Sequence, residues 1–255
     1  MLTYIRSPLD QFDISIFIGL NSPICDLSAL DFTTFSLYTL IVLITIILIY
    51  NISLDRKLII GSNLLLTIES TMDTIINMVK GQIGGKAYGY YVPLIYTLFI
   101  FILIANLIGM IPYNFAIAAS LIFIISLSFS LWLGFTILGF YIHKFEYFSL
   151  LVPVGTPIAL LPLLVLIELL SYSARAISLG LRLAANTLSG HLLMGILGGL
   201  VKTLMSLNIF SFILGFIPLA GIFCIVILEF AIACIQAYVF TILTSSYIKD
   251  SVYLH

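Results

Sequence analysis

The sequence predicts an all-α protein that crosses a membrane several times. Hydrophobic residues occupy 62% of the 255 positions and charged residues only 8%, whereas a soluble domain carries about 25% charged residues. Uncharged runs longer than the roughly 20 residues that span a bilayer recur along the chain. A formal net charge of −1 excludes the basic surface that nucleic-acid binding needs, so we expect no nucleic-acid partner.

The first predicted element is a transmembrane helix over residues 32–54, a run without charged side chains. Residues 1–31 before it mix one arginine with four aspartates, and we interpret them as a surface segment. After it, apolar residues recur at helical spacing within a more polar segment, which predicts an amphipathic helix at 60–80 lying on the membrane surface. The glycine-rich run ending at Lys86 lacks the first glycine and the hydroxyl residue of a phosphate loop, so we expect no nucleotide site there.

An uncharged run of 56 residues follows, over 87–142. At about 1.5 Å per residue it is too long for one membrane crossing. Pro112 and the glycine three residues before it interrupt the run, because proline removes a helix hydrogen bond and glycine tolerates a bend. The run therefore predicts two transmembrane helices, 91–109 and 115–141.

Two much longer helices, 158–205 and 207–248, are predicted in the rest of the chain. No proline occurs between Leu163 and Met205, and only Pro218 interrupts the second stretch. Each helix would measure about 60 Å, roughly twice the thickness of the hydrocarbon layer. Either each folds back on itself or the two form a steeply tilted hairpin. Because few glycines break them, we expect the hairpin, and we expect all elements to form a single membrane domain over 1–255.

The distribution of basic residues predicts an orientation. Residues 51–90 carry four lysines and arginines, whereas the N-terminal segment carries one. The positive-inside rule then places 51–90 on the inner side of the membrane and the N-terminus outside.

A polar stripe runs along the first long helix. Between 168 and 189, every position within about 40° of Arg182 on a helical wheel is polar. These positions are Glu168, Ser171, Arg175, Ser178, Arg182, Asn186 and Ser189. An ionisable group at membrane depth costs about 2.5–3.5 kcal/mol, so such groups face a protein partner or water. An arginine keeps its proton, so it holds a facing carboxylate in the charged form and opposes free cations, but it cannot relay a proton.

Three segments resemble subunit a of the F-type ATP synthases, in the version found in fungal mitochondria. They begin at Asn106 (NLIGMIPY), Ala174 (ARAISLGLRLAAN) and Leu228 (LEFAIACIQAY). The runs MVKGQIGGK, SPLDQF and SYIKDSVYLH extend the likeness to almost the whole chain. The resemblance implies a multi-pass stator subunit of a proton channel in the mitochondrial inner membrane, with the N-terminus toward the intermembrane space. It also implies an inclined helix hairpin that wraps the rotating c-ring.

The resemblance gives roles to the residues around the stripe. Arg182 matches the essential arginine that faces the acidic residue of the c-ring and prevents a leak between two half-channels. Asn186 and Gln236 match polar residues packed around that arginine, and Arg175 matches a second arginine of the hairpin.

The resemblance also implies two half-channels. Glu168 matches the acidic residue of the half-channel that is open to the matrix. His191 and Glu229 match the pair in the half-channel that is open to the intermembrane space, a pair that bacterial relatives carry in reverse order. For Asp250 we expect a solvated chain end, with a supporting place in the outer half-channel as the alternative.

Helical spacing adds two expectations. His191 lies nine residues after Arg182, on the opposite side of the helix, so we expect it to point toward Glu229 of the second long helix. Glu229 and Gln236 are seven residues apart and share a face, so Gln236 is expected to approach Arg182.

Purely structural roles remain open for these side chains. In a purely structural role, Arg175 and Glu168, which are seven residues apart, would pair with each other. Arg182 would then belong to an ion pair within the bundle, and His191 would be an ordinary interhelical hydrogen-bonding group. Asn186 and Gln236 would hold helices together.

Two other functions compete with the proton-channel interpretation. A secondary transporter or ion channel would show internal repeats, and a structural subunit of a respiratory complex would show repeated haem-ligating histidines; neither pattern is evident. No nucleophile triad, metal set or phosphate loop appears, and the three cysteines show no ligand or disulfide spacing. We therefore expect no cofactor, no metal and no ATP hydrolysis by this chain itself. The expected partners are the c-ring, other membrane stator subunits, the lipid bilayer and a second ATP synthase in a dimer.

Overall fold

The computed structural model describes residues 14–19, 31–53, 63–85, 88–111, 114–151 and 160–253. Within these ranges, five helical stretches are long and apolar enough to cross a membrane: Thr34–Ser53, Tyr88–Gly109, Leu121–Phe148, Leu161–Ser206 and Phe210–Val252. The only β structure in the described ranges is a two-stranded antiparallel ribbon. The all-α, polytopic class predicted from the sequence is confirmed. Most of the predicted surface segment, Lys86 and Pro112 lie outside the described residues.

The chain divides into two compact units. Unit 1 holds the described residues of Met1–Ile49, Phe101–Ser120 and Ala184–Ile235. Unit 2 holds those of Tyr50–Ile100, Leu121–Leu183 and Gln236–His255. Because single helices contribute to both units, the single membrane domain expected from the sequence stays a prediction.

Helix α1 (Thr34–Ser53) follows the ribbon of strands β1 (Ile16–Ile18) and β2 (Phe32–Thr33). The sequence predicts this helix from residue 32, but residues 32–33 pair with β1 and stay extended. The Thr33 hydroxyl accepts a hydrogen bond from the Ser36 N–H at 3.4 Å, which caps the first turn of the helix. The helix therefore begins where its capping residue ends the strand.

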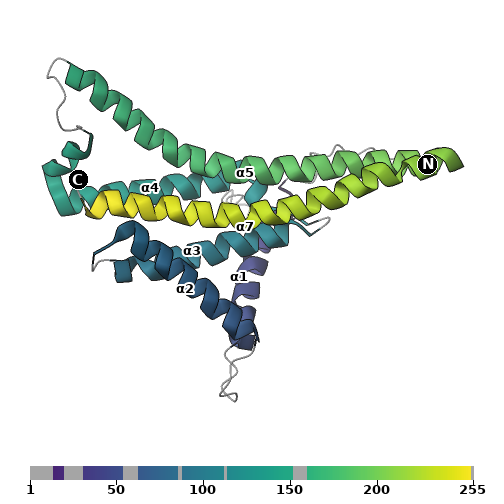
Figure 1. The fold of residues 1–255 in the computed structure, drawn as a ribbon, viewed down its shortest axis with the longest axis horizontal. Helices are drawn as coiled ribbons and strands as arrows, with labels where there is room; N and C mark the ends of the chain where they lie inside the picture. Colours follow the sequence, from purple (N-terminus) through teal and green to yellow (C-terminus); the bar gives the residue numbers. More distant parts are fainter. Residues whose placement is uncertain are drawn as a thin grey trace. The chain divides into compact units, whose positions relative to one another are not determined.

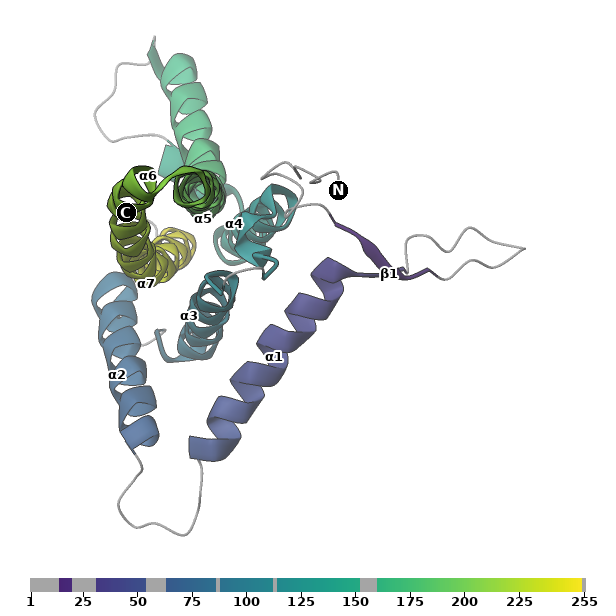
Figure 2. The same ribbon diagram turned by 90° about the vertical axis from the view of Figure 1, so that its right-hand side faces the viewer.

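Helix α2 (Asn63–Ile83) is amphipathic, and its buried side chains Ile75, Met78, Val79 and Ile83 lie on one face. The Ser245 hydroxyl of α7 (Phe216–Val252) lies 3.8 Å from the Met78 sulfur, and Figure 2 shows α2 beside α7. The helix ends where Gly84 and Gly85 adopt positive φ angles of 68° and 60°, a conformation that glycine adopts without strain. Its location on the membrane surface stays a prediction.

Between helices α3 (Tyr88–Gly109) and α4 (Leu121–His143), residues 115–119 are buried. The helix predicted from residue 115 begins only at Leu121. The Asn114 side chain donates a hydrogen bond to the Ile108 carbonyl at 2.9 Å, which also accepts one from the Ile111 N–H at 3.2 Å, and these bonds close α3. Phe115 then stacks on Tyr38 of α1, with ring centroids 5.9 Å apart. This packing keeps the segment out of α4, apart from the 3₁₀ turn η3 (Ile117–Ala119).

The two longest helices are α5 (Leu161–Leu207), with 47 residues, and α7, with 37 (Figure 1). At 1.5 Å per residue, α5 measures about 70 Å. The predicted second long helix is divided, because the short helix α6 (Ile209–Leu214) precedes α7 and Gly215 separates the two. Pro218 lies in the first turn of α7, where its missing N–H breaks no helical hydrogen bond. The steep tilt of the hairpin stays a prediction.

The C-terminal end of α7 closes unit 2. The Val252 carbonyl lies 3.1 Å from Nε2 of His143, at the end of α4. The hydroxyl of Tyr253 occupies the space that a side chain at Gly85 would fill. Residues near the end of the chain therefore hold the ends of α4 and α2.

We predict that Gly180→Ala destabilises the protein. A Cβ at this position of α5 would lie 2.7 Å from the Ser128 hydroxyl and 3.1 Å from the Ile124 carbonyl oxygen of α4, and overpacking of this kind costs about 1–3 kcal/mol. The thermal midpoint of the detergent-extracted protein should fall. The control is Gly198→Ala on the same helix, where a Cβ meets no atom within 4 Å and the midpoint should hold or rise. Equal midpoints for the two variants would contradict this account.

Candidate functional site

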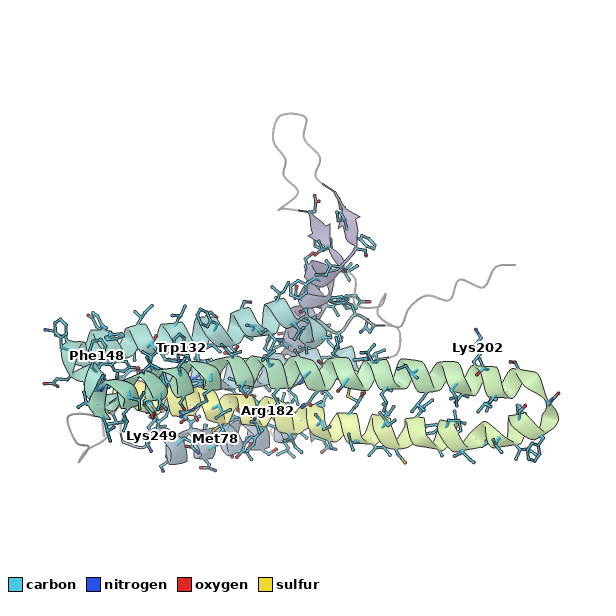
Figure 3. The ribbon with its side chains drawn as sticks, turned by 90° about the horizontal axis from the view of Figure 1, so that it is seen from above. Met78, Trp132, Phe148, Arg182, Lys202 and Lys249 are labelled. Carbon is cyan, nitrogen blue, oxygen red and sulfur yellow. The ribbon has the colours of Figure 1, made fainter. Side chains whose placement is uncertain are left out.

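Arg182 lies exposed on α5 (Figure 3). No hydrogen bond or ion pair joins its guanidinium to another residue that the structure describes. Ser171 and Ser178 on the same stripe are also exposed, and Asn186 is half-buried. A guanidinium in an apolar helix needs a counter-charge or water. The described part of this chain supplies no counter-charge to Arg182.

The face of α5 on one flank of the stripe packs into unit 2. Tyr172, Ala176, Leu179 and Leu183 are all at most 7% exposed. On the other flank of the stripe, apolar side chains are exposed: Leu163, Ile167, Leu170, Ile177 and Leu181. The stripe therefore runs along the border between the buried face and an exposed apolar face. Such a surface suits an apolar partner that brings its own charge.

Arg175 pairs with Asp250 of α7, at 3.8 Å between guanidinium and carboxylate. The Arg175 side chain is 39% exposed and that of Asp250 20%, so Asp250 is not the solvated chain end expected from the sequence. The alternative in which Arg175 pairs with Glu168 is not what the structure shows. Glu168 is half-buried and forms no ion pair with another described residue. Glu168 and Arg175, at this end of α5, therefore do not pair with each other.

Glu229 of α7 lies against Gly190 of α5, both in unit 1. A Cβ at Gly190 would overlap the Glu229 carboxylate. Its Oε1 atom is buried and has no hydrogen-bond partner among the described residues. The sequence predicts that His191 points toward Glu229, and the structure brings Glu229 to the residue just before it. His191 itself is half-buried and has contacts of its own.

Sequence reasoning missed the role of Gly190. A glycine in the interior of a helix costs roughly 0.5–1 kcal/mol relative to alanine, and this one adjoins a histidine that the sequence singles out. A glycine in a helix interior, next to that histidine, was the sequence feature that could have identified this position. The bare backbone at Gly190 lets a carboxylate approach α5 more closely than any side chain would allow.

Asn186 and Gln236 are half-buried, and neither side chain forms a hydrogen bond with another described residue. Their packing around Arg182 therefore stays a prediction. Over the part of the chain that the structure describes, no three metal-ligating side chains gather. The chemistry available here is that of carboxylates, an imidazole and guanidinium groups. The carboxylates and the imidazole bind protons, whereas the guanidinium groups bind anions and repel protons.

Comparison with known proteins gives the family. The family model described as ATP synthase A chain matches residues 33–249. The chain belongs to this family. It is 69% identical over 255 residues to ATP synthase subunit a of Pichia angusta, covering 99% of this chain and 98% of the relative. It is 60% identical over 253 residues to ATP synthase subunit a of Saccharomyces cerevisiae, covering 99% of this chain and 98% of that relative.

Membership of the ATP synthase A chain family makes the chain a proton-translocating subunit of the membrane sector. The matched range of residues includes both long helices, and with them Glu168, Arg182, His191 and Glu229. All the residues that the sequence singles out, except Asp250, lie inside it.

We predict that Gly190→Ala impairs proton translocation by the assembled ATP synthase. The added methyl group displaces the Glu229 carboxylate, and misplacing a reacting group by about 1 Å costs up to roughly 100-fold in rate. Proton conductance is measured in inner-membrane vesicles stripped of the soluble ATPase sector, at matched amounts of the subunit.

The control for Gly190→Ala is Gly199→Ala, where a Cβ meets no atom within 4 Å and conductance should be unchanged. If both variants conduct equally well, the contact between Gly190 and Glu229 does not matter for translocation.

Proposed function

We propose that this chain is the stator subunit that leads protons to and from the c-ring of ATP synthase in the mitochondrial inner membrane. One observation carries the proposal. Arg182 lies on an exposed polar stripe of an apolar helix, and no described residue of the chain neutralises it. An acidic residue of a neighbouring c-ring would supply the missing charge.

The entry path begins at His191 and Glu229. Imidazole and carboxylate groups both bind and release protons readily. The Oε1 atom of half-buried Glu229 is itself buried and has no hydrogen-bond partner in the described chain, so a proton or water is the group that would satisfy it. From this pair the proton passes to the carboxylate of a c subunit.

The exit path begins at Glu168, on the same helix as Arg182. The neutral c-ring carboxyl turns through lipid at little cost, because it carries no charge. Near Glu168 it loses its proton to the matrix side. Arg182 then pairs with the anion and blocks a direct leak between the two paths. The field drives the cycle with about 2.3 kcal/mol per charge per 100 mV.

The ion pair of Arg175 with Asp250 supports the assignment of Arg182 to a partner outside the chain. It occupies a second arginine within the chain, whereas Arg182 is left for a partner. Asn186 and Gln236 would pack around the ion pair that Arg182 forms with the c-ring. The N-terminus would face the intermembrane space, and partner subunits would carry out the synthesis of ATP. Other stator subunits and a second synthase would cover further parts of the exposed apolar surface.

We predict that Arg182→Ala abolishes coupled ATP synthesis. Removing a preorganised charge that faces a developing anion costs at least about 100-fold in rate. Respiration-driven ATP synthesis is measured in inner-membrane vesicles. The matched control is Lys202→Ala, an exposed cation on the same helix (Figure 3), which should leave synthesis intact. Survival of synthesis in the Arg182→Ala vesicles would show that the assigned role is wrong.

We also predict that Ser178→Cys forms a disulfide with a cysteine placed beside the acidic residue of the c subunit. Ser178 is exposed on the stripe, and the disulfide should stop proton pumping. The native cysteines are replaced first.

The control for this disulfide is Ala176→Cys, because Ala176 is fully buried on the face that flanks the stripe and should not react. If Ser178→Cys instead links to another helix of its own chain, the stripe is an internal packing surface and a transporter becomes the better interpretation.

A further inference from the structure

The described lysines of unit 2 gather at one end of its helices. Lys80 lies in the last turn of α2, and Lys249 lies in the last turn of α7. Lys144 follows the end of α4 and begins the 3₁₀ helix η4 (Lys144–Leu151). All three side chains are exposed. Figure 1 shows that α2, α4 and α7, which belong to unit 2 at these ends, finish on the same side of it.

A contact between α4 and α7 brings two of these lysines close to each other. The Val252 carbonyl lies 3.1 Å from Nε2 of His143, and His143 immediately precedes Lys144. On α7, Lys249 lies three residues before Val252, about 4.5 Å along the helix axis. Lys144 and Lys249 therefore lie within one helical turn of the same contact.

A second contact adds the end of α2. The Tyr253 hydroxyl occupies the space that a side chain at Gly85 would fill. The Tyr253 N–H donates to the Lys249 carbonyl at 2.9 Å, and the Gly84 N–H donates to the Lys80 carbonyl at 3.1 Å. Each of these lysines thus lies one helical turn, about 5.4 Å, before the contact. Three cations from three helices lie around one joint.

The described chain does not neutralise these three lysines. None of the side chains forms an ion pair or hydrogen bond with another residue that the structure describes. Of the nearby acids, Asp250 pairs with Arg175, and Glu146 has contacts of its own. A lysine at a helix C-terminus is favoured by the helix dipole, but that dipole amounts to only about half a negative charge. The joint therefore keeps a surplus of positive charge.

Exposed aromatic side chains mark this end of unit 2 as a membrane interface. Tyr90, in the first turn of α3, is 88% exposed, and Tyr141, in the last turn of α4, is 85% exposed. Phe145 of η4 is 88% exposed. Phe148 and Lys249 lie toward the same end in Figure 3. Aromatic side chains at the ends of transmembrane helices lie at the level of the lipid headgroups, which is also the depth of the lipid phosphates.

The start of η4 is held in a shape that keeps its charge and its ring exposed. Lys144 has a positive φ of 52°, which is unfavourable for residues other than glycine and is found where ligands are held. Tyr147 is 5% exposed and packs on α4, where a Cβ at Gly139 would overlap its ring. Because Tyr147 anchors the turn in this way, Lys144 and Phe145 remain at the surface. The turn is thus formed before any ligand arrives.

A lipid phosphate is the anion that fits this joint. At headgroup depth the bilayer itself supplies phosphates, and basic sites between transmembrane helices on the matrix side bind lipid headgroups. The lysines flank two contacts, of α4 with α7 and of α2 with α7. Two phosphates on one lipid would reach both contacts, whereas a single phosphate would reach only one.

We propose that the joined ends of α2, α4 and α7 bind an anionic phospholipid that carries two phosphates, in the leaflet that faces the matrix. One phosphate pairs with Lys144 and the other with Lys80, and Lys249 lies on the helix that both contacts share. Phe145 packs beside the upper part of the acyl chains. The leaflet follows from the predicted orientation of the chain. The lipid site goes beyond the proposed function and does not depend on the proton paths.

The first test maps the lipid on the assembled ATP synthase in phosphatidylcholine vesicles that contain a photoactivatable cardiolipin. After illumination, mass spectrometry should find the label on residues 141–148. Lys144→Ala and Lys249→Ala should each lower this labelling about five-fold, the effect of one basic residue near an anionic lipid. The double variant should lower it about 25-fold if the two effects add. Unchanged labelling in the double variant would mean that the aromatic side chains alone meet lipid, and the proposal would fail.

Two variants serve as controls for the role of charge at this joint. Lys202 is an exposed lysine of α5 in unit 1, so Lys202→Ala should leave labelling of residues 141–148 unchanged. Lys144→Arg keeps the charge and should label like the wild-type chain. A loss in Lys202→Ala as large as that in Lys144→Ala would show that the lipid responds to total charge. A loss in Lys144→Arg would show that the charge is not what binds. Either result would overturn the site.

Competition identifies the headgroup. Unlabelled cardiolipin should remove the label, and at least about five-fold more phosphatidylglycerol, counted as phosphate, should be needed for the same effect, because one phosphate cannot reach both contacts. Equal competition by the two lipids would overturn the two-phosphate site. Labelling is measured without a proton gradient, so a failure of the proposed proton paths would leave its outcome unchanged.

Discussion

The structure depends on how charged side chains on an apolar helix are neutralised. An arginine at membrane depth is costly unless a counter-charge or water accompanies it. Arg175 finds Asp250 within the chain, while Arg182, seven residues further along the same helix, finds no counter-charge among the described residues. Under the proposed function, a group outside the chain supplies that counter-charge. The exposed apolar flank of α5 is the surface along which such a group would arrive.

Much of the fold is predictable from the sequence, because the length of an apolar run and the position of its breakers decide where a helix spans. The misjudged boundaries fall where tertiary packing competes with helix formation. Phe115 looks like the start of a helix in the sequence, but it packs on Tyr38 and the helix begins after it. Gly215 separates α6 from α7, although a glycine alone is a weak signal for such a break.

The candidate site, like the fold, is predictable only where a single helix determines it. The stripe around Arg182 follows from the period of one helix and needs no knowledge of its neighbours. The contacts of Glu229 with Gly190 and of Arg175 with Asp250 depend on the register between α5 and α7, which no pattern within one helix encodes. Sequence reasoning finds the groups, and packing decides which of them meet.

The way in which the last residues hold unit 2 affects how the protein is made. Val252 and Tyr253 hold the ends of α4 and α2, so these contacts exist only after translation has passed Tyr253. Synthesis proceeds at about 5–20 residues per second. During the many seconds before that point, the earlier helices lack these contacts. A chain that stops short of Val252 would lack the contacts that hold the ends of α4 and α2.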